Sequence, residues 1–294
     1  MSRSPIVSPL RRVNWGVVLM ALPLLVWIVG LVLWPQLGLL LQSFYKVGGD
    51  TVTLANYLSI FQDSDFIFLR VFGKTLLYTL TIAALTLIVA YPMAFILAKV
   101  LKGRQKLVFI LLLATPFWVN ELIRVYAWIG LLRETGVVNY LLVDVLRVLP
   151  EPIEFLYNDA AMLVVFVYSL LLLMLLPIYS SLDGLDDTLI QAAQNLGAGW
   201  ISVFRYVVWP ASLPGVTSGL ILVFTLSFSN YLIPTLVGGK SSLWVTQLIY
   251  NRFVVATNWN LGAAYSFMLL AIASLVVWGL LKLTGQSLKK VLGS

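Results

Sequence analysis

The polar side chains that interrupt the apolar stretches of this sequence are the ones that could do chemistry. Asn120, Glu121 and Arg124 stand close together in an otherwise apolar region, with Trp118 and Tyr126 beside them. Ionisable groups inside apolar segments are costly to bury and mark binding or transfer of a polar ligand. Two interpretations are open: these residues contact a solute, or Glu121 and Arg124, three positions apart, simply pair on one helix face.

A second set of polar residues lies in later apolar runs. Ser229, Asn230 and Tyr231 come near the end of one run, and Tyr168 stands next to Ser169 in the run before it. These side chains either contact a solute or form hydrogen bonds between neighbouring helices. The candidate pathway residues are therefore Trp118, Asn120, Glu121, Arg124, Tyr126, Tyr168, Ser229, Asn230 and Tyr231.

Most enzymatic chemistry is excluded by what the chain lacks. It contains no histidine and no cysteine, which removes most redox, metal and proton-shuttle chemistry. The nearest approach to a nucleotide-binding P-loop is Gly239, Lys240 and Ser241, but Pro234 stands where that motif needs its first glycine. We predict that the chain has no catalytic residues, binds no metal or cofactor and does not hydrolyse ATP.

The composition shows which elements must position these residues. Apolar residues make up 61% of the 294 positions, charged residues 11%, and the mean hydropathy is +0.97, so the chain belongs in a bilayer. Crossing the hydrocarbon core takes about 20 apolar residues. The runs near that length predict six spans, at residues 16–42, 74–98, 107–119, 159–181, 211–233 and 261–282.

The predicted fold is an all-α polytopic membrane protein with a single domain over residues 1–294. The first run is too long for a cleaved secretory signal and is expected to remain as a span. The third run is short and breaks at Pro116, so its far end is expected to fold back or to lie along the surface.

The basic residues predict the orientation of the spans. With the N-terminus inside, lysines and arginines gather in the inner segments, as the positive-inside rule requires. They are Arg3, Arg11, Arg12, Lys99, Lys102, Arg104, Lys106, Arg205, Lys282, Lys289 and Lys290. Residues 1–14, 183–209 and 286–294 are thus predicted to be cytoplasmic. The net charge of +7 then reflects topology, and no nucleic-acid partner is expected, because no basic cluster is interleaved with aromatic residues.

The connection at residues 183–209 is amphipathic, unlike the spans around it. Asp183, Asp186 and Asp187 stand where helix starts favour acids and short polar caps. Apolar residues then recur at helical spacing, at Leu189, Ala192, Ala193 and Leu196. Gly197 and Gly199 are expected to end this helix. The helix either presents a docking face to a partner or lies on the lipid headgroups.

The spacing of this connection resembles the EAA loop of permease subunits of bacterial ATP-binding cassette (ABC) importers. That pattern is Glu-Ala-Ala, three residues, Gly, nine residues, Ile, one residue, Leu-Pro. It stands here as Gln191, Ala192, Ala193, Gly197, Val207, Trp209 and Pro210. Gln191 stands where the pattern has glutamate, so the negative charge of that position is absent here. Pro210 suits the first turn of the next span, where its missing N–H needs no partner.

The resemblance extends over roughly residues 50–280 and is closest to spermidine/putrescine and opine-type permeases. It is carried by short motifs on either side of the loop: Asn56 and Tyr57, Tyr91 and Pro92, Pro116 to Trp118, Leu122 to Arg124, Tyr126 to Trp128, Gly136, Asn139, Pro177, Tyr179, Ser180 to Leu185, Pro234, Gly238 and Gly239. In such relatives an acidic residue can occur near Asn230, where it would suit a cationic amine, but this chain has the neutral amide.

The resemblance implies a bacterial inner-membrane permease that encloses a pathway with a second, homologous or identical, permease. A periplasmic binding protein would deliver a small polar solute, such as a polyamine, an opine or an amino-acid-like compound. Two cytoplasmic ATPases, which bind ATP and magnesium, would grip the loop. The matching coupling residues are Asp187, Leu189, Gln191, Ala192, Ala193, Leu196, Gly197, Arg205 and Pro210.

The alternative function is a self-contained secondary transporter or channel. Such a transporter would usually show inverted repeats and coupling carboxylates within the membrane. This sequence shows no clear repeat, and Glu121 is its one acid near membrane depth.

Overall fold

The computed structural model describes residues 15–46, 51–62, 66–239 and 242–286. The predicted cytoplasmic tails, residues 1–14 and 286–294, lie outside these ranges, with the exception of Gln286. Lys240 and Ser241 of the P-loop-like sequence also lie outside them. The described chain is helical almost throughout, with one isolated antiparallel bridge between Tyr45 and Val52.

The first half of the fold runs from α1 to η4. Its helices are α1 (Trp15–Trp27), η1 (Ile28–Leu33), α2 (Trp34–Ser43), α3 (Ala55–Gln62), α4 (Ile67–Phe95), η2 (Ile96–Val100), α5 (Gly103–Ala114), η3 (Thr115–Trp118), α6 (Glu121–Leu132), α7 (Val137–Asn139) and η4 (Tyr140–Val145). The second half runs from α8 to α14. Its helices are α8 (Asp159–Asp183), α9 (Asp187–Asn195), α10 (Trp200–Val203), η5 (Phe204–Val208), α11 (Trp209–Phe228), α12 (Leu232–Leu236), α13 (Val245–Tyr250), η6 (Asn251–Val255) and α14 (Trp259–Thr284).

Six spans are present if the broken pair is counted as one. Five continuous helices are long and apolar enough to cross a membrane: Leu19–Ser43, Ile67–Val100, Asp159–Asp183, Trp200–Phe228 and Trp259–Thr284. The sixth consists of Gly103–Trp118 and Glu121–Val145, which are bent by 95° at their junction. The predicted number of spans and the predicted break after Pro116 are therefore confirmed.

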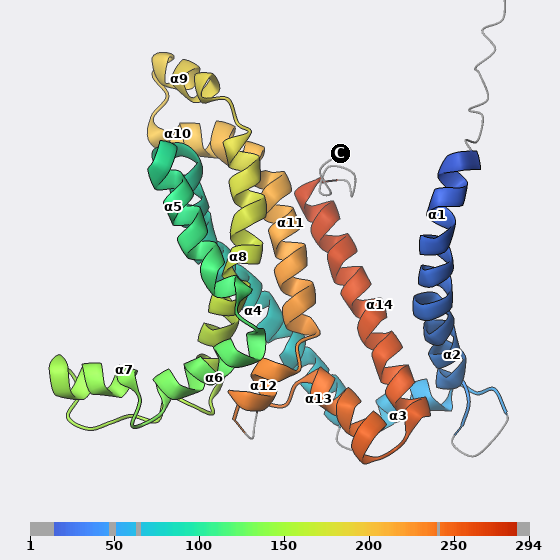
Figure 1. The fold of residues 1–294 in the computed structure, drawn as a ribbon. Helices are drawn as coiled ribbons and strands as arrows, with labels where there is room; N and C mark the ends of the chain where they lie inside the picture. The colour runs from blue at the N-terminus through green and yellow to red at the C-terminus, as the bar shows by residue number, and fades with distance from the viewer. Residues whose placement is uncertain (1–14, 47–50, 63–65, 240–241, 287–294) are drawn as a thin grey trace, which may run out of the picture.

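The break has a local cause. Pro116 lies in the 3₁₀ turn η3, and Val119 is extended, so the helix of α5 cannot continue. The Asn120 side chain then accepts a hydrogen bond of 2.8 Å from the backbone N–H of Leu122 and begins α6 anew. As a result α6 and α7 extend away from the C-terminal end of α5, across the direction of the spans (Figure 1).

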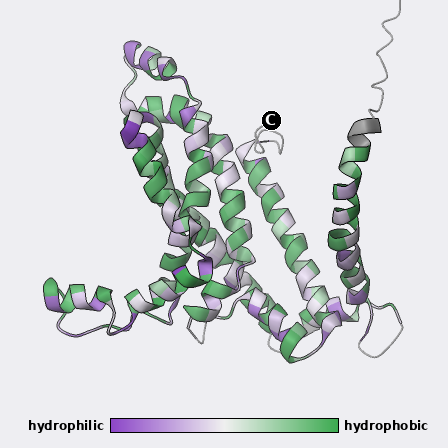
Figure 2. Cartoon of the chain, in the orientation of Figure 1, coloured by the Kyte–Doolittle hydropathy of each residue, from purple (hydrophilic) through white to green (hydrophobic). Residues whose placement is uncertain are grey.

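The core lies where α8 packs between α4 and α11. Gly215 and Gly219 of α11 allow the close approach to α8. An added Cβ would stand 2.3 Å from the carbonyl oxygen of Pro177 at Gly215, and 2.6 Å from the sulfur of Met174 at Gly219. Small residues four positions apart are a common means of helix packing in membranes. In Figure 2 the central parts of these membrane-spanning helices are largely hydrophobic, whereas α9 is largely hydrophilic.

The α1–α2 span stands apart from this core (Figure 1). None of its hydrophobic window is buried within the chain, and α2 contacts α14. Asparagines fix its lower end: Asn56 donates to the carbonyls of Ser43 and Tyr45, both at 2.8 Å, and Asn260 donates to that of Tyr45 at 2.9 Å.

The two ends of the bundle carry different elements (Figure 1). We call one the α9 end: α9, α10, the start of α1 and the end of α14 lie there. The other, the α13 end, carries α3, α6, α7, α12 and α13. The start of the first span and the end of the last therefore lie on the same side, as an even number of crossings requires.

Candidate functional site

Local residues define both ends of α9. Asp186 is the N-cap, and its carboxylate accepts a hydrogen bond of 2.9 Å from the backbone N–H of Thr188. That hydrogen bond holds the pKa of Asp186 below its ordinary value. At the other end Gly197 has a φ of +84°, a left-handed conformation that ends helices. The predicted start and end of the helix are confirmed, whereas Gly199 caps the next helix, α10.

The apolar residues of α9 divide between two faces. Ala193 and Ile190 are half-buried and pack against the core. Leu189, Ala192 and Leu196 are exposed, Leu196 at 88%. An exposed apolar face on a short, otherwise polar helix is typical of a docking surface. We call Leu189, Ala192 and Leu196 the α9 face, and the exposed Gln191 lies on the same helix.

Two ion pairs lie at the connection between α8 and α9: one joins η2 to the first residue of α9, and the other joins α5 to the last residue of α8. The Nζ of Lys99 lies 2.6 Å from Oδ1 of Asp187 and donates to the carbonyl of Leu185 at 2.5 Å. The Nζ of Lys106 lies 2.5 Å from Oδ1 of Asp183. The sequence interpretation counted these charges only by membrane side and missed the pairing. Opposite charges on the same side were the available signal.

Pro210 stands in the first turn of α11, which begins at Trp209, as predicted. The helical path nevertheless runs on from α10 through η5 into α11, because Trp200–Phe228 is one continuous helix. A proline lacks the N–H of an interior helix position. The preceding η5 is a π-helical segment, in which the N–H of Trp209 donates to the carbonyl of Phe204. Arg205 of η5 is exposed and lies over the ring of Tyr206, at 5.7 Å.

A polar junction joins α6 to the end of α11. The Nδ2 of Asn230 donates to Oε1 of Glu121 at 2.9 Å. None of the three ion pairs found among the described residues involves Arg124. The structure thus decides between the open alternatives at Glu121: this carboxylate is held by a distant amide and does not pair with Arg124 on its own helix.

The predicted fifth span ends earlier than residue 233. Helix α11 stops at Phe228, so Ser229, Asn230 and Tyr231 lie in the break before α12 and not within the span. Asn230 organises this break, because its Oδ1 accepts from the N–H of Ile233 at 3.0 Å and its carbonyl accepts from Thr246 at 2.8 Å. A broken helix next to a carboxylate is a common way to build a solute site.

The other predicted pathway residues are spread over the surroundings of this junction. Trp118 is 86% exposed and Tyr126 is 56% exposed. Tyr168 meets the ring of Trp128 at 5.3 Å, and Tyr231 meets that of Tyr250 at 4.9 Å. The remaining two make local bonds: Asn120 caps α6, and Ser229 donates to the carbonyl of Thr225 at 2.9 Å.

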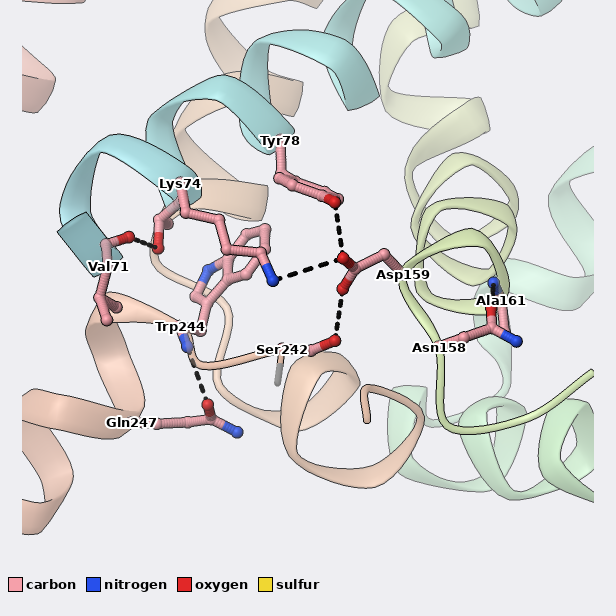
Figure 3. Close-up of polar contacts among 10 residues, drawn as sticks. Val71, Lys74, Tyr78, Asn158, Asp159, Ala161, Ser242, Trp244 and Gln247 are labelled. Atoms are coloured by element: carbon pink, nitrogen blue, oxygen red, sulfur yellow. Dashed lines mark hydrogen bonds and ion pairs between the residues drawn. The ribbon is translucent and has the colours of Figure 1, made fainter. Parts of the chain in front are cut away.

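A cluster at the α13 end was not foreseen from the sequence. Asp159, the first residue of α8, accepts a hydrogen bond of 2.6 Å from Tyr78 and lies 3.3 Å from the Nζ of Lys74. Its other oxygen accepts from Ser242 (Figure 3). One carboxylate thereby joins α4, α8 and the segment before α13. The sequence showed Asp159 only as an acid near a span boundary.

Comparison with known proteins gives the family. Residues 92–284 match the family model described as "Binding-protein-dependent transport system inner membrane component". The chain is 32% identical over 258 residues to the spermidine/putrescine transport system permease protein PotB of Haemophilus influenzae, covering 86% of this chain and 88% of that protein. It is 31% identical over 260 residues to PotB of Escherichia coli K12, covering 85% and 91%.

A shorter match and a solved structure complete the comparison. Over 34% of this chain and 39% of the relative, it is 30% identical to the permease protein PotC of Haemophilus influenzae. A crystal structure of a bacterial ABC transporter that imports the acidic polysaccharide alginate has the same fold, with a TM-score of 0.73 and 17% identity over 92% of this chain and 95% of that one. The chain therefore belongs to the binding-protein-dependent transport inner membrane component family and is a permease subunit of an ABC importer.

Proposed function

We propose that this permease subunit docks an ATPase through the α9 face and carries a small polar organic solute past the junction of Glu121 and Asn230. The observation that carries the first part is the exposed apolar face of a helix whose first residue is fixed by an ion pair, with a second ion pair at the end of the preceding helix α8. A helix held in this way transmits movement to the spans on either side of it, α8 and α11.

The proposed orientation follows from the charges at the α9 end. Lys99 pairs with Asp187 of α9 and Lys106 pairs with Asp183 at the end of α8, and Lys102 and Arg104 lie between these two lysines in the sequence. The positive-inside rule places such a cluster in the cytoplasm. The α9 face would then meet a cytoplasmic ATPase, while the α13 end would face the periplasm and a solute-binding protein.

The proposed partners also include a second permease. The α1–α2 span is long enough to cross the membrane, and none of its hydrophobic window is buried within this chain. This exposed span and the partial match to PotC support a complex of two related permeases with two ATPases. The relatives named for spermidine and putrescine transport support an organic amine as the solute, either a polyamine or an opine or amino-acid-like compound. Glu121, next to the helix break, supplies a carboxylate suited to an ammonium group.

The docking proposal is tested by placing a charge on the α9 face. Leu196→Asp, in the complex reconstituted with its ATPases, is expected to reduce both ATPase association and ATP-dependent uptake at least tenfold. Leu196 is 88% exposed, so the fold has no need of its side chain. Val148→Asp is the matched control, because Val148 is equally apolar and 68% exposed in the connection after η4. Full association and uptake in Leu196→Asp would contradict the proposal.

A further inference from the structure

A small cavity lies where α5, η3 and α6 meet α8. Its volume is about 100 Å³, and it is lined largely by leucines, with Pro116, Phe117, Arg124, Tyr168 and Ser169 supplying the remaining surface. The space is smaller than the roughly 150 Å³ cavity that holds a benzene molecule in an engineered protein. It therefore has room for a head group and not for a whole organic solute.

Two polar atoms in the wall of this cavity have no hydrogen-bond partner in the part of the chain that the structure describes. The hydroxyl of Ser169 is buried without a hydrogen bond, in a residue that is only 4% exposed, and the Nε of Arg124 is also buried and unbonded. Leaving such groups unpaired costs free energy, so nearly all buried polar groups in proteins are satisfied. Two unsatisfied donors in one small space indicate a ligand that accepts hydrogen bonds from both.

The charge of the cavity is positive and uncompensated. Arg124 takes part in none of the ion pairs among the described residues, and Oε1 of Glu121 accepts its hydrogen bond from Asn230. The guanidinium instead lies 5.6 Å from the centre of the Phe117 ring, a contact that leaves its hydrogen-bond donors available.

We infer that this cavity binds a carboxylate group of the transported solute, held by the guanidinium of Arg124 and the hydroxyl of Ser169. A guanidinium matches the two oxygens of a carboxylate in a planar, paired geometry. The apolar remainder of the wall strengthens that interaction by excluding water. The binding of the carboxylate satisfies both orphaned donors and neutralises the charge of Arg124.

This inference rests on the proposed function and narrows its substrate class. Glu121 lies one turn before Arg124 on α6, and side chains three positions apart on a helix are neighbours, with Cβ atoms about 5–6 Å apart. A solute bound by both therefore carries an ammonium and a carboxylate a short distance from each other. That description fits an amino-acid-like or opine-like compound and excludes a simple polyamine, which has no carboxylate.

The test uses two probes that differ only in the carboxylate: ornithine and 1,4-diaminobutane. Binding of each radiolabelled probe to the intact transporter complex in nanodiscs is measured by equilibrium dialysis. We expect ornithine to bind at least about tenfold more tightly than the diamine. Arg124→Gln is expected to weaken ornithine binding by about 10- to 100-fold, the usual effect of losing hydrogen bonds to a charged group, and to leave diamine binding unchanged or stronger.

Two further variants separate binding from structure. Ser169→Ala is expected to weaken ornithine binding about threefold to tenfold, while Arg124→Lys, which keeps the charge, is expected to restore part of the preference for ornithine lost in Arg124→Gln. Equal affinity for the two probes in the unaltered complex would overturn the inference. So would release of the second permease by Arg124→Gln, because the charge would then serve the subunit interface.

The two proposals fail independently. If the complex takes up solute in an ATP-dependent manner but shows no carboxylate preference, the cavity assignment is wrong and the docking proposal stands. If Leu196→Asp leaves ATPase association intact while Arg124→Gln abolishes the preference for ornithine, the docking proposal is wrong and the cavity assignment stands.

Discussion

The Nδ2 of Asn230, in the break that ends α11, donates a hydrogen bond of 2.9 Å to Oε1 of Glu121, the first residue of α6. This contact joins two interrupted spans at their breaks. It fixes the only glutamate of the predicted pathway set, and Arg124 has no carboxylate partner among the described residues. Both consequences follow from one amide, and both can be tested.

Replacing Asn230 removes a donor to Glu121 and the cap on the backbone N–H of Ile233. We expect Asn230→Ala to destabilise the subunit by about 1–3 kcal/mol, measured by denaturant-induced unfolding in mixed micelles. Ser229→Ala is the matched control, because Ser229 is exposed and its hydroxyl donates only to the carbonyl of Thr225, one turn back; its effect should stay below about 0.5 kcal/mol. Equal effects of the two substitutions would show that the junction adds no stability.

The two glycines after α9 differ in one respect. An added Cβ would have open space at both Gly197 and Gly199, but only Gly197 has a positive φ, +84°. A side chain in that conformation costs about 1–2 kcal/mol. We therefore expect Gly197→Ala to lower ATPase association and uptake, and Gly199→Ala to leave both near the unaltered level. Equal behaviour of the two variants in a pull-down assay would contradict this.

The Lys99–Asp187 pair should couple α9 to the end of the α4 span. The Lys99 side chain is 8% exposed and that of Asp187 is 62% exposed, so Asp187→Asn leaves a nearly buried ammonium with the carbonyl of Leu185 alone. A double-mutant cycle with Lys99→Met is expected to give a coupling energy of about 1 kcal/mol, measured by unfolding. A value near zero would mean that the contact does not hold the helix.

The cluster around Asp159 should stabilise the α13 end. Asp159→Asn removes the charge that faces Lys74 and weakens the acceptor of Tyr78 and Ser242. We expect a loss of about 1–3 kcal/mol, and increased hydrogen exchange in α13. Asp144→Asn, at an exposed position in η4, supplies the control and should change neither quantity.

The N-cap of α9 should loosen only in acid. Because the pKa of Asp186 is lowered in the folded chain, its contribution is fully present above the unfolded value of about 3.9 and is lost as the pH falls through the lower folded value. Hydrogen exchange of the α9 amides, corrected for its intrinsic pH dependence, should therefore be constant from neutral pH to about 4 and rise below it. Asn is an equally good cap without a proton to gain, so Asp186→Asn should abolish the rise; an unchanged rise would mean that another group is responsible.

Features governed by local chemistry could be predicted from the sequence. The span count follows from the length of apolar runs against the thickness of a bilayer, and the break at Pro116 follows from a missing N–H. Asp186 and Gly197 mark the ends of α9 because a cap or a left-handed turn depends on a few neighbouring residues. The place of Pro210 in the first turn of α11 could be predicted in the same way, whereas the π-helical segment η5 that joins α10 to α11 could not.

The tertiary structure alone decided which distant side chains meet. Glu121 and Arg124 were plausible partners at helical spacing, yet Glu121 bonds to Asn230, 109 positions away, and Asp159 meets Tyr78 and Ser242 at separations of 81 and 83. The pattern of apolar residues fixes that a helix crosses the membrane but not which face of it turns toward each neighbour. That choice depends on close packing between helices, such as that of Gly215 and Gly219 against α8. The same packing determines where every charge in the pathway lies.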